Sequence, residues 1–169
     1  MPNWCQNVLV VSGGEREVLS FVSKVSGDSP LMFASLVPEP DGLLERVDLS
    51  FEKCFDLSLP EEELDWSAWR RRFWGSKWEA NFDFGGGLII REGRAYSGLS
   101  EATFDFVTAW SPPTEWVKRA SEIFPSLDFS LTFAEAGNDF AGRLVSKNGQ
   151  AREEELSVSK VLSSDSRWY

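Results

Sequence analysis

The amino-acid sequence predicts an α+β fold in which helices cover one face of an antiparallel sheet. Several segments place apolar residues at every second position, as strands with one buried face do. Other segments repeat their apolar residues at helical spacing and lie between these strands along the chain. The length of 169 residues suits one hydrophobic core.

The first part of the chain is expected to hold a strand, a helix and a second strand. Residues 7–11 are mostly apolar and β-branched and stop at two glycines, which predicts a buried strand. Residues 15–25 carry apolar side chains at helical spacing and predict the helix. Residues 31–37 predict the second strand, which ends at the proline-rich turn of residues 38–42.

A weakly patterned, acidic stretch follows, and we expect about residues 39–65 to be an insertion. A helix is predicted from Pro60, because proline suits the first turn and the following glutamates suit the positive end of the helix dipole. The apolar surface of this helix continues to Gly75. Residues 81–91 alternate on both sides of the triple glycine at residues 85–87, which predicts a strand or hairpin with a bend.

The last part of the chain is predicted to hold a strand, a helix and a hairpin. Residues 102–110 alternate most clearly, and the Ser-Pro-Pro that follows ends the strand and starts a helix at residues 114–124. Residues 127–134 and 140–146 predict the hairpin. Residues 150–169 are expected to form an edge strand, a short helix or a tail.

These elements predict one domain over residues 1–149, followed by a C-terminal extension at residues 150–169. No apolar run reaches the roughly 18 residues of a membrane span, and the N-terminus lacks the order of a signal peptide. We therefore expect a cytoplasmic protein without a membrane partner.

The sequence contains no histidine, which excludes Ser-His and Cys-His nucleophile pairs and the usual nitrogen ligand of zinc. Cys5 and Cys54 fit no metal-binding spacing, so we expect two buried free thiols. Carboxylate, lysine and tyrosine chemistry stays open, as does magnesium bound by acids.

The net charge of −10 is unevenly distributed along the chain. Residues 31–65 contain ten acids and two basic residues, whereas residues 66–78 contain four basic residues and no acid. The acidic stretch is expected to fold against the basic one, to form a solvated face, or to bind a basic partner. The acids at its end are candidates for such binding: Glu61, Glu62, Glu63 and Asp65.

Four blocks combine large rings with glycine or proline. They are Pro2-Asn3-Trp4-Cys5 with Asn7, Trp74-Gly75-Ser76-Lys77-Trp78, Thr108-Ala109-Trp110-Ser111-Pro112-Pro113, and Glu135-Ala136-Gly137 with Phe140-Ala141-Gly142. With these blocks the chain resembles the YubB-type ferredoxin-like domain family, small proteins of bacterial plasmids and phages whose activity is not established. The resemblance implies a ferredoxin-like antiparallel sheet, here with an inserted acidic loop or helix. Phe73 and Glu79 depart from the family's pattern, which has Asn and Asp there.

The blocks lie at predicted strand ends or helix boundaries. We therefore interpret their tryptophans, with Trp116, chiefly as joints that hold the sheet to the helices. Polar residues beside these joints are further binding candidates, although bonds to the backbone at strand ends are the simpler interpretation. These candidates are Asn3, Asn7, Lys77, Glu135 and Asp139.

Two other functions stay open. Arg70, Arg71, Arg72 and Lys77 lie beside tryptophans, as in proteins that bind single-stranded nucleic acid, although the net charge opposes this. A carboxylate-metal hydrolase would need convergence of four acids: Glu79, Asp83, Glu135 and Asp139. The triple glycine is interpreted as a bulge, because no Lys-Ser/Thr pair of a phosphate loop follows it.

The leading hypothesis is a non-enzymatic binding protein of a phage or plasmid that occupies a host or defence protein, without a cofactor or metal. Its acidity, the missing catalytic set and the family resemblance motivate this hypothesis. An inhibitor or a mimic of DNA charge would be a special case. We expect binding through the exposed sheet face, the acidic segment or both, and an open sheet face would also allow a homodimer.

Overall fold

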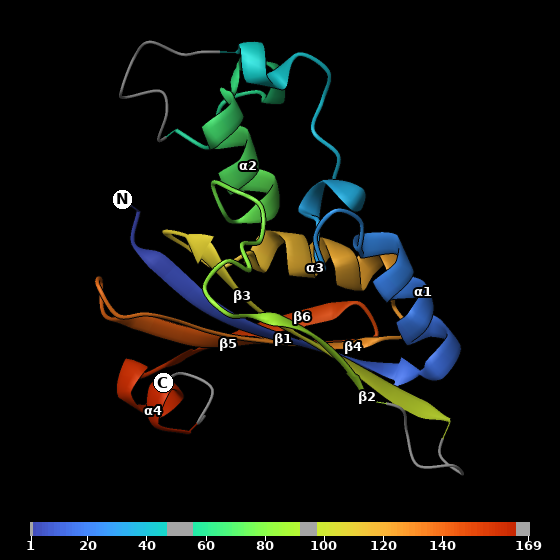
Figure 1. Ribbon diagram of the computed structural model, residues 1–169. Coiled ribbons are helices and arrows are strands. Elements are labelled where there is room, and N and C mark those ends of the chain that lie inside the picture. The colour runs from blue at the N-terminus through green and yellow to red at the C-terminus, as the bar shows by residue number, and fades with distance from the viewer. Residues whose placement is uncertain (1, 47–55, 92–97, 165–169) are drawn as a thin grey trace.

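The computed structural model describes residues 2–46, 56–91 and 98–164 (Figure 1). In chain order the strands and α-helices are β1 (Trp4–Gly14), α1 (Glu15–Val25), α2 (Trp66–Trp74), β2 (Gly87–Arg91), β3 (Leu99–Ala109), α3 (Thr114–Ile123), β4 (Asp128–Glu135), β5 (Phe140–Lys147), β6 (Gln150–Leu156) and α4 (Val158–Ser164).

The strands form one sheet in the order β2-β3-β1-β4-β5-β6, and all neighbours are antiparallel. Helix α1 follows β1, and α3 connects β3 to β4, so the first four strands have the β-α-β-β-α-β connectivity of a ferredoxin-like fold. This confirms the predicted fold class. Strands β5 and β6 extend the sheet beyond β4.

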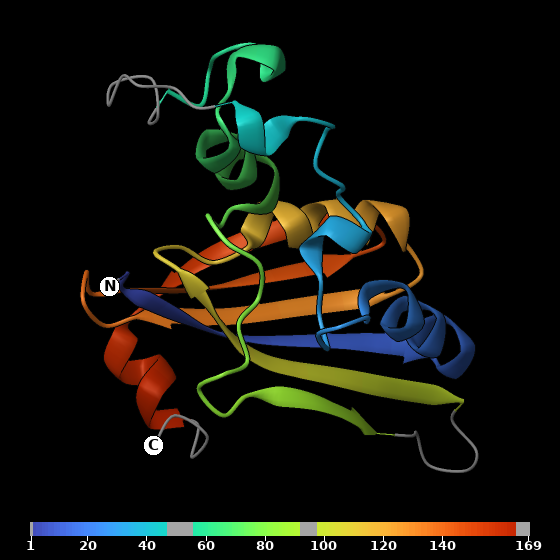
Figure 2. The ribbon, with the colours of Figure 1, turned by 45° about the horizontal axis from the view of Figure 1, so that its top comes forward.

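The main core lies between the sheet and the helices α1 and α3 (Figure 2). Phe21 of α1 is fully buried, and its ring centroid lies 6.2 Å from that of Phe104 and 5.4 Å from that of Phe129. The buried Trp116 of α3 donates its indole N–H to the carbonyl oxygen of Phe33 at 2.9 Å. Alternation along the strands thus places one row of side chains under the helices.

Helix α4 packs on the opposite face of the sheet (Figure 1). Its Val161 is buried against Ala134 of β4 and Ala141 of β5. The predicted helix layer on one face of the sheet therefore comprises α1 and α3. The small side chains on β4 and β5 allow α4 to cover part of the other face.

The predicted strand at residues 31–37 is wrong. Phe33–Ser35 form a single 3-10 turn instead. The backbone N–H groups of Phe33 and Ala34 both donate to the carboxylate of Glu79, and the bond from Ala34 is 2.9 Å long. A side chain distant in the sequence accepts these N–H groups in place of a neighbouring strand, and the local sequence does not predict this contact.

The inserted segment stands on α3, with α2 packed against that helix (Figure 2). The α-helix does not start at Pro60, because Glu61–Glu63 form only a 3-10 turn. Helix α2 starts at Trp66, since the Asp65 side chain caps its first turn with a 2.7 Å hydrogen bond. It ends at Gly75, which has a φ of 82°.

Residues 81–84 do not form the regular strand that their alternation predicts. Asn81 makes an isolated bridge to Val107, and β2 begins only at Gly87. Between them the chain approaches β3 closely: a Cβ atom added to Gly86 would lie 1.9 Å from the carbonyl oxygen of Asp105. A glycine is required at this position.

The segment expected as a C-terminal extension provides both an edge strand and a short helix. Strand β6 pairs with β5 along its whole length, and α4 follows it. The boundary expected near residue 149 falls in the turn between two paired strands. Across the described residues, no helix combines the length and apolar character that a membrane crossing requires.

Candidate binding surface

Three aromatic side chains from distant parts of the chain cluster at the start of β1. The ring centroid of Trp4 lies 6.0 Å from that of Trp78 and 5.2 Å from that of Phe84. Trp78 and Phe84 belong to the segment between α2 and β2 and remain 37% and 65% exposed. We call Trp4, Trp78 and Phe84 the aromatic surface.

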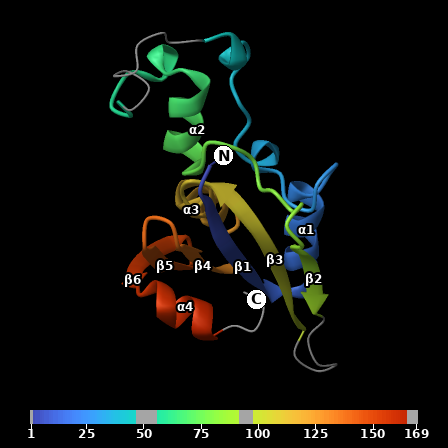
Figure 3. The same ribbon diagram turned by 60° about the vertical axis from the view of Figure 1, so that its left-hand side comes forward.

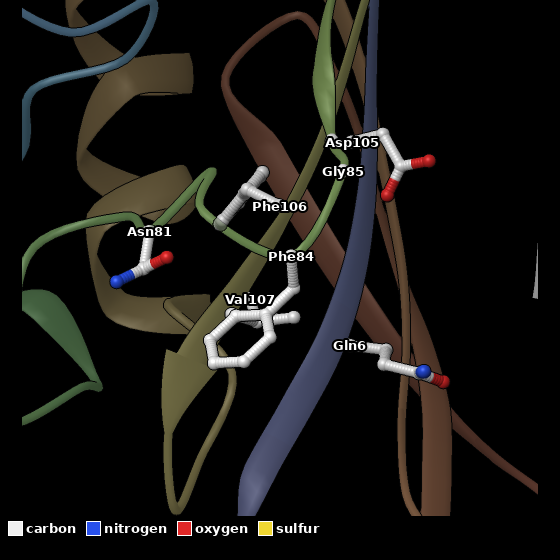
Figure 4. Close-up of a pocket in the computed structure, with 8 residues that line it drawn as sticks. Gln6, Asn81, Phe84, Gly85, Asp105, Phe106 and Val107 are labelled. Atoms are coloured by element: carbon white, nitrogen blue, oxygen red, sulfur yellow. The ribbon is translucent and has the colours of Figure 1, made fainter.

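A shallow hollow of about 100 Å³ borders the aromatic surface (Figure 4). Figure 4 shows the Phe84 ring beside Val107, with Gln6 on the neighbouring strand. Asn81 and Asp105 also line the hollow. Pockets for drug-sized ligands start at roughly 300 Å³, so this hollow fits a single side chain better than a cofactor.

Hydrogen bonds fix the position of Trp78. The buried hydroxyl group of Ser76 lies 3.0 Å from the carbonyl oxygen of Trp78, to which it donates. The hydroxyl group of Ser111 donates to the carbonyl oxygen of Gly75 at 2.6 Å. The second block of the sequence is thereby bound to the third.

Trp110 is exposed on a strained turn. Its φ of 71° and the 2.9 Å hydrogen bond from Ser111 N–H to the Ala109 carbonyl define a tight three-residue turn. The Trp110 N–H donates to the Asn3 carbonyl at 2.9 Å. The Trp110 side chain is 46% exposed. Such backbone strain costs about 1–3 kcal/mol and is concentrated at functional sites.

Asn7 joins β1 to β3 inside the protein. It is fully buried, and its Nδ2 donates to the Cys5 carbonyl and to Thr108 Oγ1, both at 2.8 Å. Thr108 Oγ1 in turn donates to the Ser111 carbonyl at 2.8 Å. This binding candidate therefore satisfies groups inside the protein.

Glu135 organises the turn between β4 and β5. It is 2% exposed, and its carboxylate accepts hydrogen bonds from the Gly137 N–H and from the backbone and side chain of Asn138. Asn3 packs on this turn, because a Cβ added to Gly137 would lie 2.6 Å from Asn3 Nδ2. Asp139 is exposed in the same turn, with a φ of 53°.

Cys5 is a fully buried free thiol. Burial raises its pKa well above the ordinary value, and the nearby Glu135 carboxylate raises it further. A thiol held in its neutral form is a poor nucleophile and a poor metal ligand. Cys54 lies outside the described residues.

The acids proposed for metal binding have separate roles. Glu79 accepts the two N–H groups of the 3-10 turn, and burial raises its pKa. Asp83 accepts a 3.2 Å hydrogen bond from the side chain of Asn81. Among residues 2–46, 56–91 and 98–164, no three His, Cys, Asp or Glu side chains form a group that could hold a metal ion.

The arginines of the basic run bond to the inserted segment and within α2. Arg70 forms an ion pair with Glu39. Arg71 Nε donates to the Ser67 carbonyl at 3.2 Å, and Arg72 donates to the Leu59 carbonyl at 2.7 Å. The structure thus gives these arginines internal partners.

Lys77 and Arg70 stack on the tryptophans of α2 and of the segment that follows it. Lys77 Nζ lies 5.2 Å from the ring centroid of Trp66 and 6.0 Å from that of Trp78. The Arg70 guanidinium lies 5.3 Å from the Trp66 ring and 5.1 Å from the Trp74 ring. Lys77 therefore places a cation next to the aromatic surface.

The four acidic candidates lie in different environments. Asp65 is buried as the cap of α2, and Glu61 accepts a 3.0 Å hydrogen bond from the indole of Trp69. Glu62 and Glu63 are exposed. Of the four candidates, Glu62 and Glu63 therefore remain the ones suited to contact a partner.

Sequence reasoning did not foresee the aromatic surface. Trp74 and Trp116 are buried joints, as interpreted, but Trp78 and Trp110 are substantially exposed. Phe84 is not among the residues that the sequence predicts to bind. The sequence signal was its position directly before the triple glycine, where a large ring has little local chain to cover it.

The comparisons with known proteins agree with the fold. A family model described as the ferredoxin-like domain in Api92-like protein matches residues 73–159. The crystal structure of a protein Api92 from Yersinia pseudotuberculosis is similar over 93% of this chain and 99% of that chain, with a TM-score of 0.57 and 11% identity. At that identity the likeness shows the fold alone. No curated protein matches the chain.

Proposed function

The chain belongs to the family of Api92-like proteins that contain a ferredoxin-like domain, and we propose that it acts as a non-enzymatic binding protein. Its partner is a host or defence protein in the bacterial cytoplasm. The chain itself is of phage or plasmid origin, as its resemblance to YubB-type proteins suggests. Binding inhibits the partner, and mimicry of DNA charge by the exposed acids is a special case.

The main support for this proposal is that Trp78 and Phe84 are exposed to solvent although the surrounding chain is held in place. Exposed apolar patches mark interaction sites, and tryptophan is enriched among the residues that dominate interface energies. Contact with Trp4 and the hydrogen bonds of Ser76 and Ser111 hold this region in place. A preformed surface loses little conformational entropy when it binds.

The charged candidates complement the aromatic surface. Glu62 and Glu63 are exposed and would attract a basic partner over several ångströms of solvent. In contrast, Asn7, Asp65 and Glu135 make internal hydrogen bonds, which favours structural roles for them over catalysis. A partner with an apolar patch and a basic rim would fit both features.

Affinity capture from a bacterial lysate tests the proposal. The aromatic surface is removed in the variant Trp78→Ala/Phe84→Ala. The matched control is Leu19→Ala/Ile123→Ala, because these side chains on α1 and α3 are 46% and 41% exposed. We expect wild type and control to capture one stoichiometric partner that the surface variant loses, with all three proteins folded.

The proposal fails if wild type captures no stoichiometric partner, or if the surface variant captures the partner as well as the control does. The charge component has its own comparison. Glu62→Gln/Glu63→Gln should slow association at low salt, whereas Glu154→Gln/Glu155→Gln on β6 should not.

A further inference from the structure

Strand β2 is an apolar strand at the edge of the sheet. It stands at one end of the sheet order, and Figure 3 shows it at the margin opposite β6. Ile89 and Ile90 are 52% and 42% exposed. An exposed hydrophobic edge strand has backbone donors and acceptors ready to pair with another chain.

The other edge of the sheet has a different character. Strand β6 has one basic and three acidic residues in succession, and these side chains are exposed: Arg152, Glu153, Glu154 and Glu155. Charged side chains are the common means by which proteins prevent unwanted pairing at an edge strand. Strand β2 contains no acid, and its single charged residue is Arg91.

We infer that β2 pairs with β2 of a second copy of this chain, so that the sheet continues across a symmetric dimer. A two-fold axis at Ile89 places Ile89 opposite its own copy and Leu88 opposite Ile90. Gly87 then lies opposite Arg91. The edge is therefore self-complementary, as an interface of this symmetry requires.

Charge supports a second copy as the occupant. Gly87 lies opposite Asp105 in the β2–β3 register, on one face of the sheet. Within its own chain Arg91 forms a long, exposed ion pair with Glu101, at 3.8 Å, and such pairs contribute little energy. Arg91 of the second copy can therefore exchange this partner, cross Gly87, which has no side chain, and reach towards Asp105 over two strand spacings, roughly 9–10 Å. The symmetry forms this pair twice. The acidic inserted segment stands far from β2 (Figure 1), so two acidic copies repel each other less at this edge than at β6, which has three acids.

The interface is small, because β2 contains five residues. Small interfaces belong to the weak, transient class. We therefore expect a dimer that forms and dissociates with concentration.

Sedimentation velocity from low to high micromolar concentration tests the dimer. Wild type should shift from 19.0 kDa towards twice that mass. Ile89→Lys should remain monomeric and folded, because like charges opposite each other destabilise a strand pair. Ile123→Lys, which places the same charge at an exposed position on α3, should dimerise as wild type does.

A cysteine variant gives a second measurement that does not require disruption of the interface. Opposed Cα atoms in an antiparallel pair are about 4.5–5.5 Å apart, within disulfide range. Under mild oxidation Ile89→Cys should form a covalent dimer, and Ile123→Cys should not. A wild type that stays monomeric at every concentration overturns the inference. So does a dimer that Ile89→Lys leaves intact and Ile89→Cys fails to cross-link.

Discussion

The ring of Phe84 lies 5.2 Å from the ring of Trp4, so the segment between α2 and β2 and the first strand of the sheet share one surface. Phe84 precedes the close approach of Gly86 to β3, and Trp4 starts β1. The buried core thus holds Trp4 and Phe84 in place, although Phe84 is largely exposed. The proposed binding therefore requires that the contacts between the sheet and the segment after α2 stay intact.

Gly75 lies where α2 meets the start of α3, so we expect Gly75→Ala to lower the free energy of unfolding substantially. Gly75 has a φ of 82°, and an added Cβ would lie 2.7 Å from the Pro112 carbonyl oxygen. Gly85 is the matched control, with a φ of 96° and no atom within 4 Å of its added Cβ. Backbone strain alone should cost Gly85→Ala about 1–2 kcal/mol. Urea unfolding should show a clearly larger loss for Gly75→Ala, and equal losses would contradict the account.

The buried amide of Asn7 should be required for stability. Asn7→Ala removes the donor to the Cys5 carbonyl and to the Thr108 hydroxyl group. Unsatisfied buried groups cost about 1–3 kcal/mol, so the free energy of unfolding should fall by that amount. Gln150→Ala, at an exposed position on β6, should change it by less than about 0.5 kcal/mol. If Asn7→Ala leaves stability unchanged, its structural role is refuted.

Glu79 predicts a pH dependence of stability. Burial raises its pKa in the folded protein above the ordinary value of 4.5, although the N–H groups of Ala34 and Phe33 oppose this. The folded state then binds the proton more tightly than the unfolded state does. The contribution of Glu79 to the free energy of unfolding is therefore greatest in acid and falls as the pH rises from about 4.5 through the raised pKa.

Glu79→Gln cannot titrate and provides the measurement. The unfolding free energy of wild type minus that of Glu79→Gln should decrease as the pH rises from 4.5 towards neutrality. Urea unfolding at a series of pH values gives this difference. A difference that stays constant, or increases with pH, would show that the pKa of Glu79 is not raised.

Cys5 should resist alkylation in the native protein. Its thiol is 0% exposed, and burial raises its pKa, so little thiolate forms at neutral pH. Iodoacetamide labelling, read at Cys5 by peptide mapping, should be slow in buffer and fast in urea. Peptide mapping separates this site from Cys54. Rapid native labelling at Cys5 would contradict its burial.

Local pattern predicted most of the fold. The helix expected at residues 15–25 matches α1, because the apolar side chains at helical spacing are the ones that the structure buries: Val18, Phe21, Val22 and Val25. Strands expected at residues 102–110 and 140–146 were likewise found, as β3 and β5 with small differences at their ends. In these elements the side chains that the sequence pattern places on one face are the ones that the fold buries.

The misses have a common physical cause. Residues 31–37 were predicted as a strand, but the carboxylate of Glu79, 46 residues away from Phe33, binds the backbone there. The aromatic surface also depends on contacts between distant segments, since Trp78 and Phe84 meet Trp4 only in the folded chain. Periodicity indicates which side chains share a face, but it does not indicate which of them another segment covers.

The affinity of the captured partner, once purified, tests the central claim most directly. Calorimetry should show that Trp78→Ala/Phe84→Ala binds at least about tenfold more weakly than wild type, a loss of about 1.4 kcal/mol or more. Leu19→Ala/Ile123→Ala should bind as wild type does. Equal affinity of the surface variant and wild type would contradict the claim that the aromatic surface binds the partner.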